Sequence, residues 1–366
     1  MAQEKRYNQI DTIKGLAALM VLVNHSLNFV FTQEWIFKLS RCCVALFILC
    51  AGFTLHISFS RFAAKGKLSL NNIIIHFFLR SVARIILPYS VYVIVFYVAM
   101  HKCIDLPKII EHIFSFNINN PCYYFLIYIG LLLITPIVYY IVQCIFELKG
   151  IKRGVAQVLF VVFCAVIGYL NVRYTLVLET AFAAGKFLFG GTYLPLYVIG
   201  VMISKYLSLN DKFTEKKVAI HFIISTSLIT IWVISLFLFP NVHIFLENQF
   251  IPGIGGNPPS ASIFIGSLLL FWFFWSLHSF VELKTSGKYR FRALGACGQC
   301  SLYIYMYHQI IKYIMLQIIR FFELPKQSIW YAMPFYLLST IGVIIVYKLY
   351  GLLTKDFSKK LSKTEE

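Results

Sequence analysis

The chain has 366 residues, of which 59% are hydrophobic and only 13% are charged. Because ordinary soluble domains carry about 25% charged residues, this composition excludes a soluble protein and predicts one membrane domain over residues 1–366, without a separate soluble domain. The formal net charge of +18 does not indicate a nucleic-acid-binding protein. The basic residues form short clusters between apolar runs, so we expect them to contact membrane lipids instead.

Apolar runs follow one another along the whole chain, each close to the ~20 residues that a helix needs to cross the hydrocarbon core. The runs are continuously apolar and lack the alternation of barrel strands, which predicts an all-α, polytopic bundle of about ten transmembrane helices. The predicted helices cover residues 10–31, 40–60, 85–101, 123–146, 155–175, 187–207, 218–239, 260–281, 301–322 and 329–353.

The lysines and arginines predict the orientation of this bundle. With ten helices, 23 of the 33 basic residues fall on the side of the N-terminus and only 8 on the opposite side. Because basic residues are enriched in cytoplasmic segments, we expect the N- and C-termini both to be cytoplasmic.

This orientation predicts the behaviour of reporter fusions. A reporter fused after Glu366 should lie in the cytoplasm, because ten crossings return the chain to its starting side. A second fusion after Asn119, in the predicted loop between the third and fourth helices, should lie outside. An external reporter at Glu366 would contradict the ten-helix topology.

The first predicted helix carries ionisable residues at positions that normally exclude them: Asp11, Lys14 and His25. Lys14 and His25 are eleven residues apart, so they lie within roughly 20° of each other around the helix and about 16 Å apart along it. Such groups usually face a cavity or a partner, and Asn24 lies beside the histidine. Two other interpretations are open: an Asp11–Lys14 ion pair with His25 bonded to another helix, or a transport path.

Arg80 and Arg84 form a second candidate site at the predicted cytoplasmic entry of helix 85–101. Four residues separate them, so both lie on one helical face, where guanidinium groups bind phosphates bidentately. Alternatively, they only orient the helix in the membrane.

His308 is the third candidate, and it lies with Tyr305 in the segment Ser301–His308. A histidine among tyrosines is either a packing residue or a substrate contact. Counting along the helices places His308 about 10 Å past Ser301 and His25 about 21 Å past Asp11. We therefore expect His308 to be shallower than His25 and nearer to a cytosolic ligand.

The nine cysteines predict neither a disulfide framework nor a metal site. Cys297 and Cys300 form a C-x-x-C motif, but the βαβ context of a redox site and a partner pair for zinc are both missing. Cys103 and Cys122 flank a predicted outer loop, where a disulfide is compatible with the spacing but is not fixed by it.

The segment Asn8–His25 resembles the opening signature of acyltransferase family three, the integral membrane O- and N-acyltransferases that modify envelope glycans. That signature has an aspartate, a basic residue and, after ten further residues, a histidine; here these are Asp11, Lys14 and His25. The basic residue of the family is usually arginine.

Three later segments also match the family in order. Arg80–Pro88 is similar to the arginine pair and proline of its third helix, with a wider spacing between the arginines. Tyr124–Leu126 followed by Thr135-Pro136 is similar to its Trp-Phe-Leu helix, and Ser301–His308 is similar to its late Ser-Leu-x-Ile-Tyr-x-x-His element.

The resemblance implies an O-acyltransferase of a bacterial inner membrane, which moves an acyl group, most simply acetyl, from acyl-CoA to a hydroxyl of a surface polysaccharide or lipid-linked glycan. Acetyl-CoA or another acyl-CoA would be a co-substrate, with no permanently bound cofactor. His25 would act as general base or acyl carrier, with Asp11 orienting Lys14. The expected donor- and substrate-binding residues are Lys14, Arg80, Arg84, His308, Asn24 and Tyr305.

The main rival interpretation is a transporter or flippase of a lipid-linked glycan, since a polar stripe and ten helices suit that function too. Against it, the sequence lacks a pattern of Gly- or Pro-broken helices repeated in its two halves.

Overall fold

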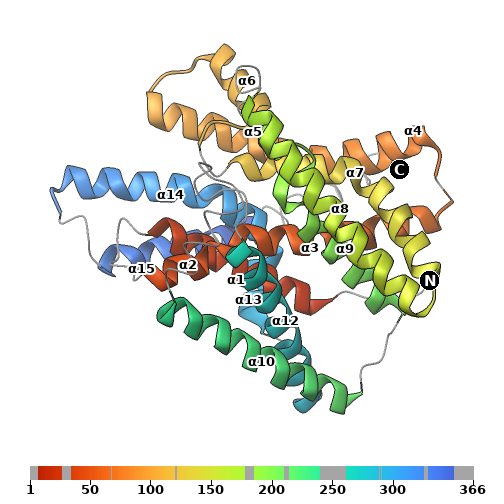
Figure 1. The fold of residues 1–366 in the computed structure, drawn as a ribbon. Helices are drawn as coiled ribbons and strands as arrows, with labels where there is room; N and C mark the ends of the chain where they lie inside the picture. The colour runs from red at the N-terminus through yellow and green to blue at the C-terminus, as the bar shows by residue number, and fades with distance from the viewer. Residues whose placement is uncertain are drawn as a thin grey trace, which may run out of the picture. The chain divides into compact units, whose positions relative to one another are not determined.

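The computed structural model describes residues 7–26, 34–66, 68–119, 122–177, 185–209, 214–239, 261–287, 289, 291–324 and 329–349. All regular structure within these residues is helical (Figure 1), which confirms the predicted all-α class. Residues 27–31, 260 and 350–353 of the predicted helices lie outside the described residues, as do both ends of the chain.

Eight described helical segments are long and apolar enough to cross a membrane. They are Lys38–Ala64, Leu70–His101, Tyr123–Glu147, Gly150–Asn171, Phe189–Leu209, Glu215–Leu238, Ala261–Lys284 and Trp330–Leu349. The chain is therefore a multi-pass membrane protein. The predicted helices 10–31 and 301–322 correspond to α1 (Asn8–His25) and α14 (Ser301–Phe321), which are more polar than these eight. The count of ten crossings and the location of the termini stay predictions.

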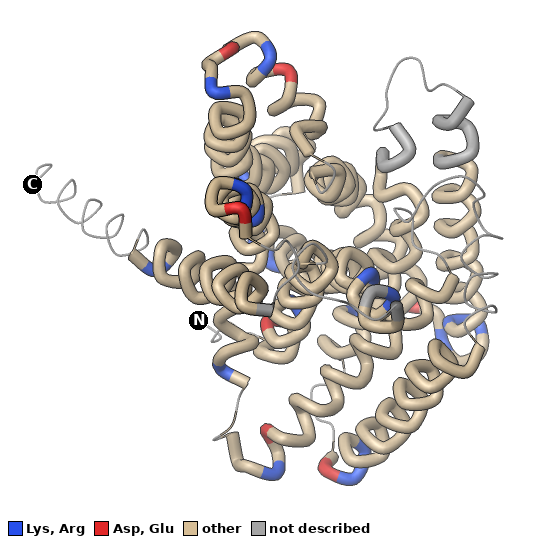
Figure 2. The backbone as a smooth tube through the Cα atoms, turned by 90° about the vertical axis from the view of Figure 1, so that its left-hand side faces the viewer, with Lys and Arg blue, Asp and Glu red and all other residues tan. Residues whose placement is uncertain are grey.

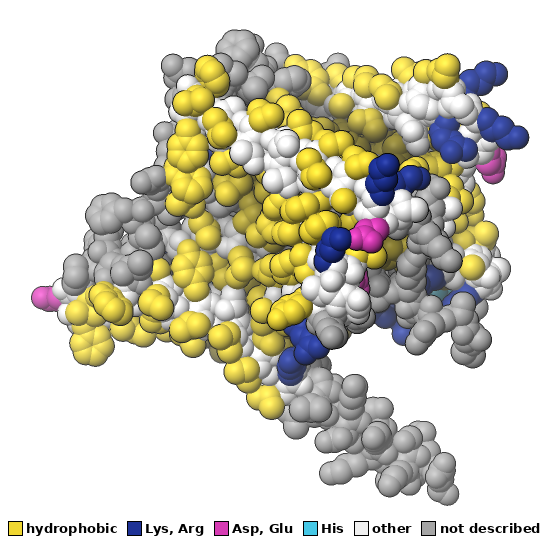
Figure 3. All heavy atoms as spheres, turned by 90° about the horizontal axis from the view of Figure 1, so that it is seen from below, with side chains coloured by type: hydrophobic (Ala, Val, Ile, Leu, Met, Phe, Trp, Pro, Cys, Tyr) yellow, Lys and Arg dark blue, Asp and Glu magenta, His cyan; other side chains and the backbone are white. Residues whose placement is uncertain are grey.

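Exposed side chains agree with a lipid environment. Leu87, Val91, Ile94 and Val95 of α5 (Arg80–His101) are all solvent-exposed in the isolated chain, and yellow apolar side chains cover much of the face shown in Figure 3. Figure 2 shows that charged residues gather at helix ends and turns. Apolar helix surfaces with charged ends are what a bilayer requires.

The described chain folds into two compact units, and each is assembled from segments that are distant in the sequence. The first unit comprises residues 1–43, 215–239 and 268–366, and the second comprises residues 44–214 and 240–267.

The first unit is built around α1, whose residues Ile13, Ala17, Ala18 and Leu22 are completely buried. Figure 1 shows α13 lying beside α1. The other helices of this unit are α2 (Glu34–Ser40), α10 (Glu215–Leu238), most of α12 (Ala261–Lys284), α13 (Arg292–Gln299), α14, and α15 (Ile329–Leu337) with the π-helical η5 (Leu338–Gly342).

The second unit is built around α3 (Cys42–Ala64), which is buried along most of its length. Helix α3 crosses α9 (Leu194–Leu209) at two glycines: a Cβ on Gly52 would lie 2.0 Å from the Tyr197 carbonyl oxygen, and one on Gly200 would lie 2.1 Å from that of Leu49. The remaining elements are α4 (Leu70–Asn72), the π-helical η2 (Ile73–Leu79), α5, α6 (Leu106–Ser115), α7 (Tyr123–Glu147), α8 (Gly150–Val177) and the 3₁₀-helical η4 (Gly185–Tyr193).

The largest boundary difference concerns the predicted helix 85–101. In the structure this helix is one continuous segment, Leu70–His101, of 32 residues. It begins earlier because Asn71, Asn72 and His76 interrupt the apolar run without ending the helix; the segment Ile73–Leu79 adopts a π-helical turn. At 1.5 Å per residue the segment exceeds the ~30 Å core, so its first turns have room to lie outside the hydrocarbon.

Candidate active site

His25, at the end of α1, and His308, in α14, lie side by side within the first unit. Their ring centroids are 4.8 Å apart and the ring planes are inclined by 40°. The expectation that His308 lies clearly shallower than His25 is therefore wrong. Counting the rise along each helix ignores the angle at which two helices cross, and these helices converge at the histidines.

The hydrogen bonds of His308 determine its tautomer. Its side chain is fully buried, with 0% exposure, and its Nδ1 lies 3.2 Å from the Ile304 carbonyl oxygen. Because a carbonyl oxygen only accepts, Nδ1 carries the proton. In the neutral ring, Nε2 then accepts from the Gln309 side-chain amide at 2.8 Å. Both nitrogens of His308 are thus already engaged, and Tyr305 packs edge-on against the ring at 6.1 Å.

His25 differs from its partner because its ring is only half-buried. Within the described residues, neither of its ring nitrogens has a hydrogen-bond partner. A neutral imidazole with an available nitrogen accepts a proton from a substrate hydroxyl or attacks a carbonyl carbon. Of the two histidines, His25 is therefore the one equipped to react.

Lys312 joins this pair, and it was not among the predicted site residues. It lies one helical turn after His308, is half-buried, and interacts electrostatically with both His25 and His308. The sequence contained a signal for it, namely a lysine within a predicted span and four residues after a candidate histidine. The sequence does not show that α1 and α14 meet at this position, so Lys312 could be interpreted only as an isolated charge.

Asn24 and Ser26 flank His25 and contribute further polar groups. The Oδ1 atom of Asn24 is buried without a hydrogen-bond partner among the described residues. The Ser26 hydroxyl lies 2.6 Å from that of Tyr336 in α15 and 2.9 Å from the Val23 carbonyl oxygen. An unsatisfied amide oxygen next to the available imidazole offers a contact for a polar ligand.

Asp11 and Lys14 lie in the first half of α1, and both side chains are half-buried. Here α13 approaches so closely that glycine is required on both helices. A Cβ on Gly298 would lie 1.8 Å from the Asp11 carbonyl oxygen, and the Cβ of a side chain at Gly15 would lie 1.9 Å from that of Leu294. The backbone of the Asp11 turn is thereby held against α13.

The C-x-x-C motif lies at this crossing, with Gly298 between its cysteines. Cys297 and Cys300 are both buried free thiols, and burial raises the pKa of each thiol. A buried thiol with a raised pKa is a poor nucleophile. Cys103 and Cys122 are also free thiols, the first exposed and the second buried, and the described residues contain no group of three or more potential metal ligands.

Sequence reasoning missed a polar network between α1 and α12. The Thr12 hydroxyl lies 2.8 Å from Nδ1 of the buried His278, and the Gln9 amide donates to Glu282 at 3.3 Å. His278 lies within an apolar run, and an ionisable residue there was the available signal. The network attaches the first turns of α1 to α12.

Arg80 and Arg84 belong to the second unit, where both are exposed. They were expected at the entry of a transmembrane helix, but they lie ten and fourteen residues into Leu70–His101, directly after the π-helical η2. Single π-helical turns occur often at functional sites. The four-residue spacing keeps both guanidinium groups on one helical face.

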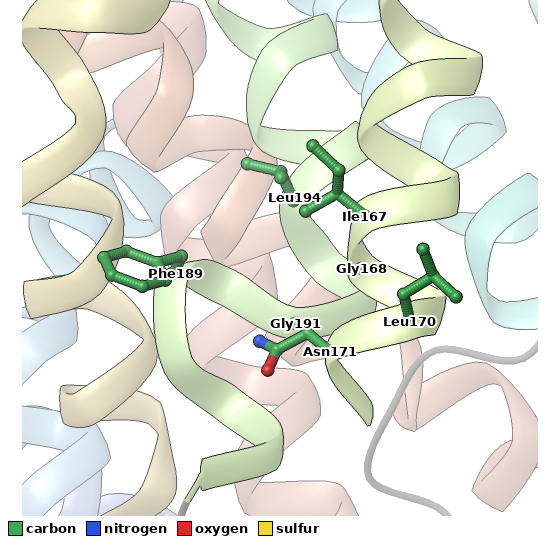
Figure 4. Close-up of a pocket in the computed structure, with 7 residues that line it drawn as sticks. All are labelled: Ile167, Gly168, Leu170, Asn171, Phe189, Gly191 and Leu194. Atoms are coloured by element: carbon green, nitrogen blue, oxygen red, sulfur yellow. The ribbon is translucent and has the colours of Figure 1, made fainter. Parts of the chain in front are cut away.

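The second unit also contains an open apolar pocket of about 410 Å³ between α8, η4 and the start of α9 (Figure 4). Asn171 is the only polar side chain that Figure 4 labels in it, and none of the predicted site residues lines it. The lining residues are Ile167, Gly168, Leu170, Asn171, Phe189, Gly191 and Leu194.

A family model described as an acyltransferase domain matches residues 7–348, nearly the whole chain. The chain belongs to acyltransferase family three. No curated protein and no solved structure matches it. The matched residues span both units and include all residues discussed above. The His25–His308 pair therefore lies inside the acyltransferase domain.

Proposed function

We propose that this member of acyltransferase family three transfers an acyl group, most simply acetyl, from cytosolic acyl-CoA to a hydroxyl of an envelope glycan. The acceptor is a surface polysaccharide or a lipid-linked glycan, and the enzyme acts in the bacterial inner membrane. The observation that carries the proposal is the pairing of the available His25 imidazole with the fully engaged His308 ring, 4.8 Å away, in a chain of this family.

His25 acts as the general base in this proposal. It takes the proton of the acceptor hydroxyl while the hydroxyl oxygen attacks the thioester carbonyl carbon. The carbon–sulfur bond then breaks, and the imidazolium returns the proton to the departing thiolate, which leaves as free CoA. Lys312, which interacts electrostatically with both rings, supplies a cation for the negative charge that develops on the carbonyl oxygen.

His308 positions His25 and does not take the proton. Its Nδ1 donates to the helix backbone and its Nε2 accepts from Gln309, so its ring is fixed and presents one side to His25. Asn24 and Tyr305 shape the space around the two rings. Because the fixed ring of His308 packs against His25, it holds the reacting imidazole in one orientation before the reaction. Less orientational entropy is then lost on reaching the transition state.

Arg80 and Arg84 of the second unit bind the donor in this proposal, because the lysine and arginine distribution predicts that the first half of their helix faces the compartment that contains acyl-CoA. We expect Arg80→Ala or Arg84→Ala to weaken acyl-CoA binding by about 1.5–3 kcal/mol, the usual cost of a lost charge-assisted hydrogen bond. Titration calorimetry on purified protein measures this effect, and Lys152→Ala, at an exposed lysine of α8, is the control. Unchanged affinity in the double arginine variant would show that the pair serves only to orient the helix.

The function is tested by mass spectrometry of the envelope glycans with and without the gene. Acyl groups on one glycan should disappear on deletion and return with the wild-type chain, while the amount of exported polymer stays constant. Loss of exported polymer with acylation preserved would instead indicate a transporter or flippase.

A further inference from the structure

The second unit contains a polar cluster that the proposed reaction does not use. It consists of His56 from α3, Gln143 from α7, and Ser204 with Lys205 from α9. We call these four residues the His56–Lys205 cluster. All four come from the core helices of one unit, so their mutual arrangement is set by the packing of α3, α7 and α9.

His56 is only 3% exposed, and its Nε2 is buried without a hydrogen-bond partner among the described residues. Its Nδ1 lies 2.8 Å from the Ser204 hydroxyl oxygen. We assign the hydroxyl of Ser204 as the donor to Nδ1, because this hydroxyl has no other acceptor within the described chain and the opposite direction would leave its proton unbonded as well. In the neutral ring Nε2 then carries the proton, and His56 presents an unsatisfied buried N–H donor. A buried N–H without an acceptor is unfavourable, so this position favours a ligand that accepts a hydrogen bond.

Lys205 is a half-buried cation whose hydrogen-bond partner is the side-chain oxygen of Gln143. The described residues place no carboxylate within ion-pair distance of it. It interacts electrostatically with His56. The side-chain oxygen of Gln143 already accepts from Lys205, so the side-chain NH₂ group of Gln143 is left as a further hydrogen-bond donor. The cluster therefore combines a cation with N–H donors, and no carboxylate of the described residues pairs with that cation.

The depth of the cluster fits a ligand at the cytoplasmic surface. His56 lies eight residues before the end of α3, Ser204 five before the end of α9, and Gln143 four before the end of α7. At 1.5 Å per residue, these positions are about 6–12 Å from the helix ends. The lysine and arginine distribution predicts that these three ends face the cytoplasm.

We propose that the His56–Lys205 cluster is an anion-binding site that takes a phosphate group. Lys205 supplies the charge, and His56 Nε2 and the Gln143 amide donate hydrogen bonds to phosphate oxygens. Two sources offer this chemistry at the cytoplasmic surface: a phosphate of the coenzyme A donor, in which case the inference rests on the proposed function, and the phosphate of an anionic lipid headgroup.

The test uses the full chain in lipid nanodiscs and two probes. In the first arm, calorimetry measures binding of coenzyme A and of dephospho-coenzyme A, which lacks the 3′-phosphate. In the second arm, native mass spectrometry counts retained phosphatidylglycerol against phosphatidylcholine. The variants are Lys205→Gln, Lys205→Arg and His56→Gln, and Lys152→Gln, at an exposed lysine of α8, is the matched control.

We expect Lys205→Gln to weaken binding of one probe by about tenfold or more, with Lys205→Arg close to wild type and His56→Gln intermediate. A loss confined to coenzyme A identifies the donor, and a loss confined to phosphatidylglycerol identifies a lipid. Unchanged binding of both probes by Lys205→Gln overturns the proposal, even if the chain still transfers acyl groups. Failure of the wild-type chain to bind coenzyme A would contradict the proposed function, while the lipid arm still decides the anion site.

Discussion

Replacing His25 with alanine is expected to abolish acyl transfer while the protein remains folded in the membrane. The ring is half-buried and terminates α1, so its removal leaves no void comparable to a lost core residue. General-base catalysis contributes about 10²–10⁴-fold to a rate, and a glycan hydroxyl is too weak a nucleophile without it. Glycan acylation measured by mass spectrometry in cells, with the amount of membrane-inserted protein quantified in parallel, checks the result.

We expect His308→Ala to lose part or all of the acyl-transfer activity. The loss should appear as a lower kcat more than as a higher KM. Both nitrogens of His308 are engaged within α14, so the substitution removes support for His25 without removing a group that contacts substrate. His76→Ala, at an exposed histidine of η2, is the control and should match wild type. Substantial transfer by a well-expressed His25→Ala protein would contradict the mechanism.

The family and the helical class followed from sequence because both depend on local patterns. A continuously apolar segment crosses a bilayer as a helix. The spacing of Asp11, Lys14 and His25, which resembles the family signature, lies within a single helix and is therefore readable from the sequence. The predicted start of the helix 85–101 was wrong, because a helix can continue through polar residues. Asn71 and His76 interrupt the apolar run but not the helix, so Arg80 was placed at an entry and not inside a long helix.

The details of the site depended on which helices meet, and a single sequence does not contain that information. Lys312 and His278 were visible as ionisable residues in apolar runs, but their partners come from α1, more than 260 positions away. In the sequence, Gly298 is only one of the two residues between Cys297 and Cys300, and nothing marks it as a close-packing position. The structure shows why glycine is needed at this position: a Cβ on residue 298 would overlap the carbonyl oxygen of Asp11.

Gly298→Ala is therefore expected to destabilise the first unit strongly. The added Cβ would lie 1.8 Å from the Asp11 carbonyl oxygen, far inside the contact distance of two atoms. The obstacle is backbone, so no side-chain rotation relieves it and α1 and α13 must separate. Overpacking typically costs about 1–3 kcal/mol and sometimes more. We expect a lower thermal unfolding midpoint in detergent and reduced acyl transfer, because the Asp11–Lys14 turn moves with the backbone.

Gly295→Ala provides a matched control on the same helix. A Cβ at Gly295 meets nothing within 4 Å, and alanine in a helix interior is favoured over glycine by about 0.8–1.0 kcal/mol. This variant should therefore be as stable as wild type or slightly more stable. The pair separates two explanations, because a general intolerance of α13 to substitution would lower both midpoints. Equal midpoints for Gly298→Ala and Gly295→Ala would show that the close approach of α13 to Asp11 does not hold the site together.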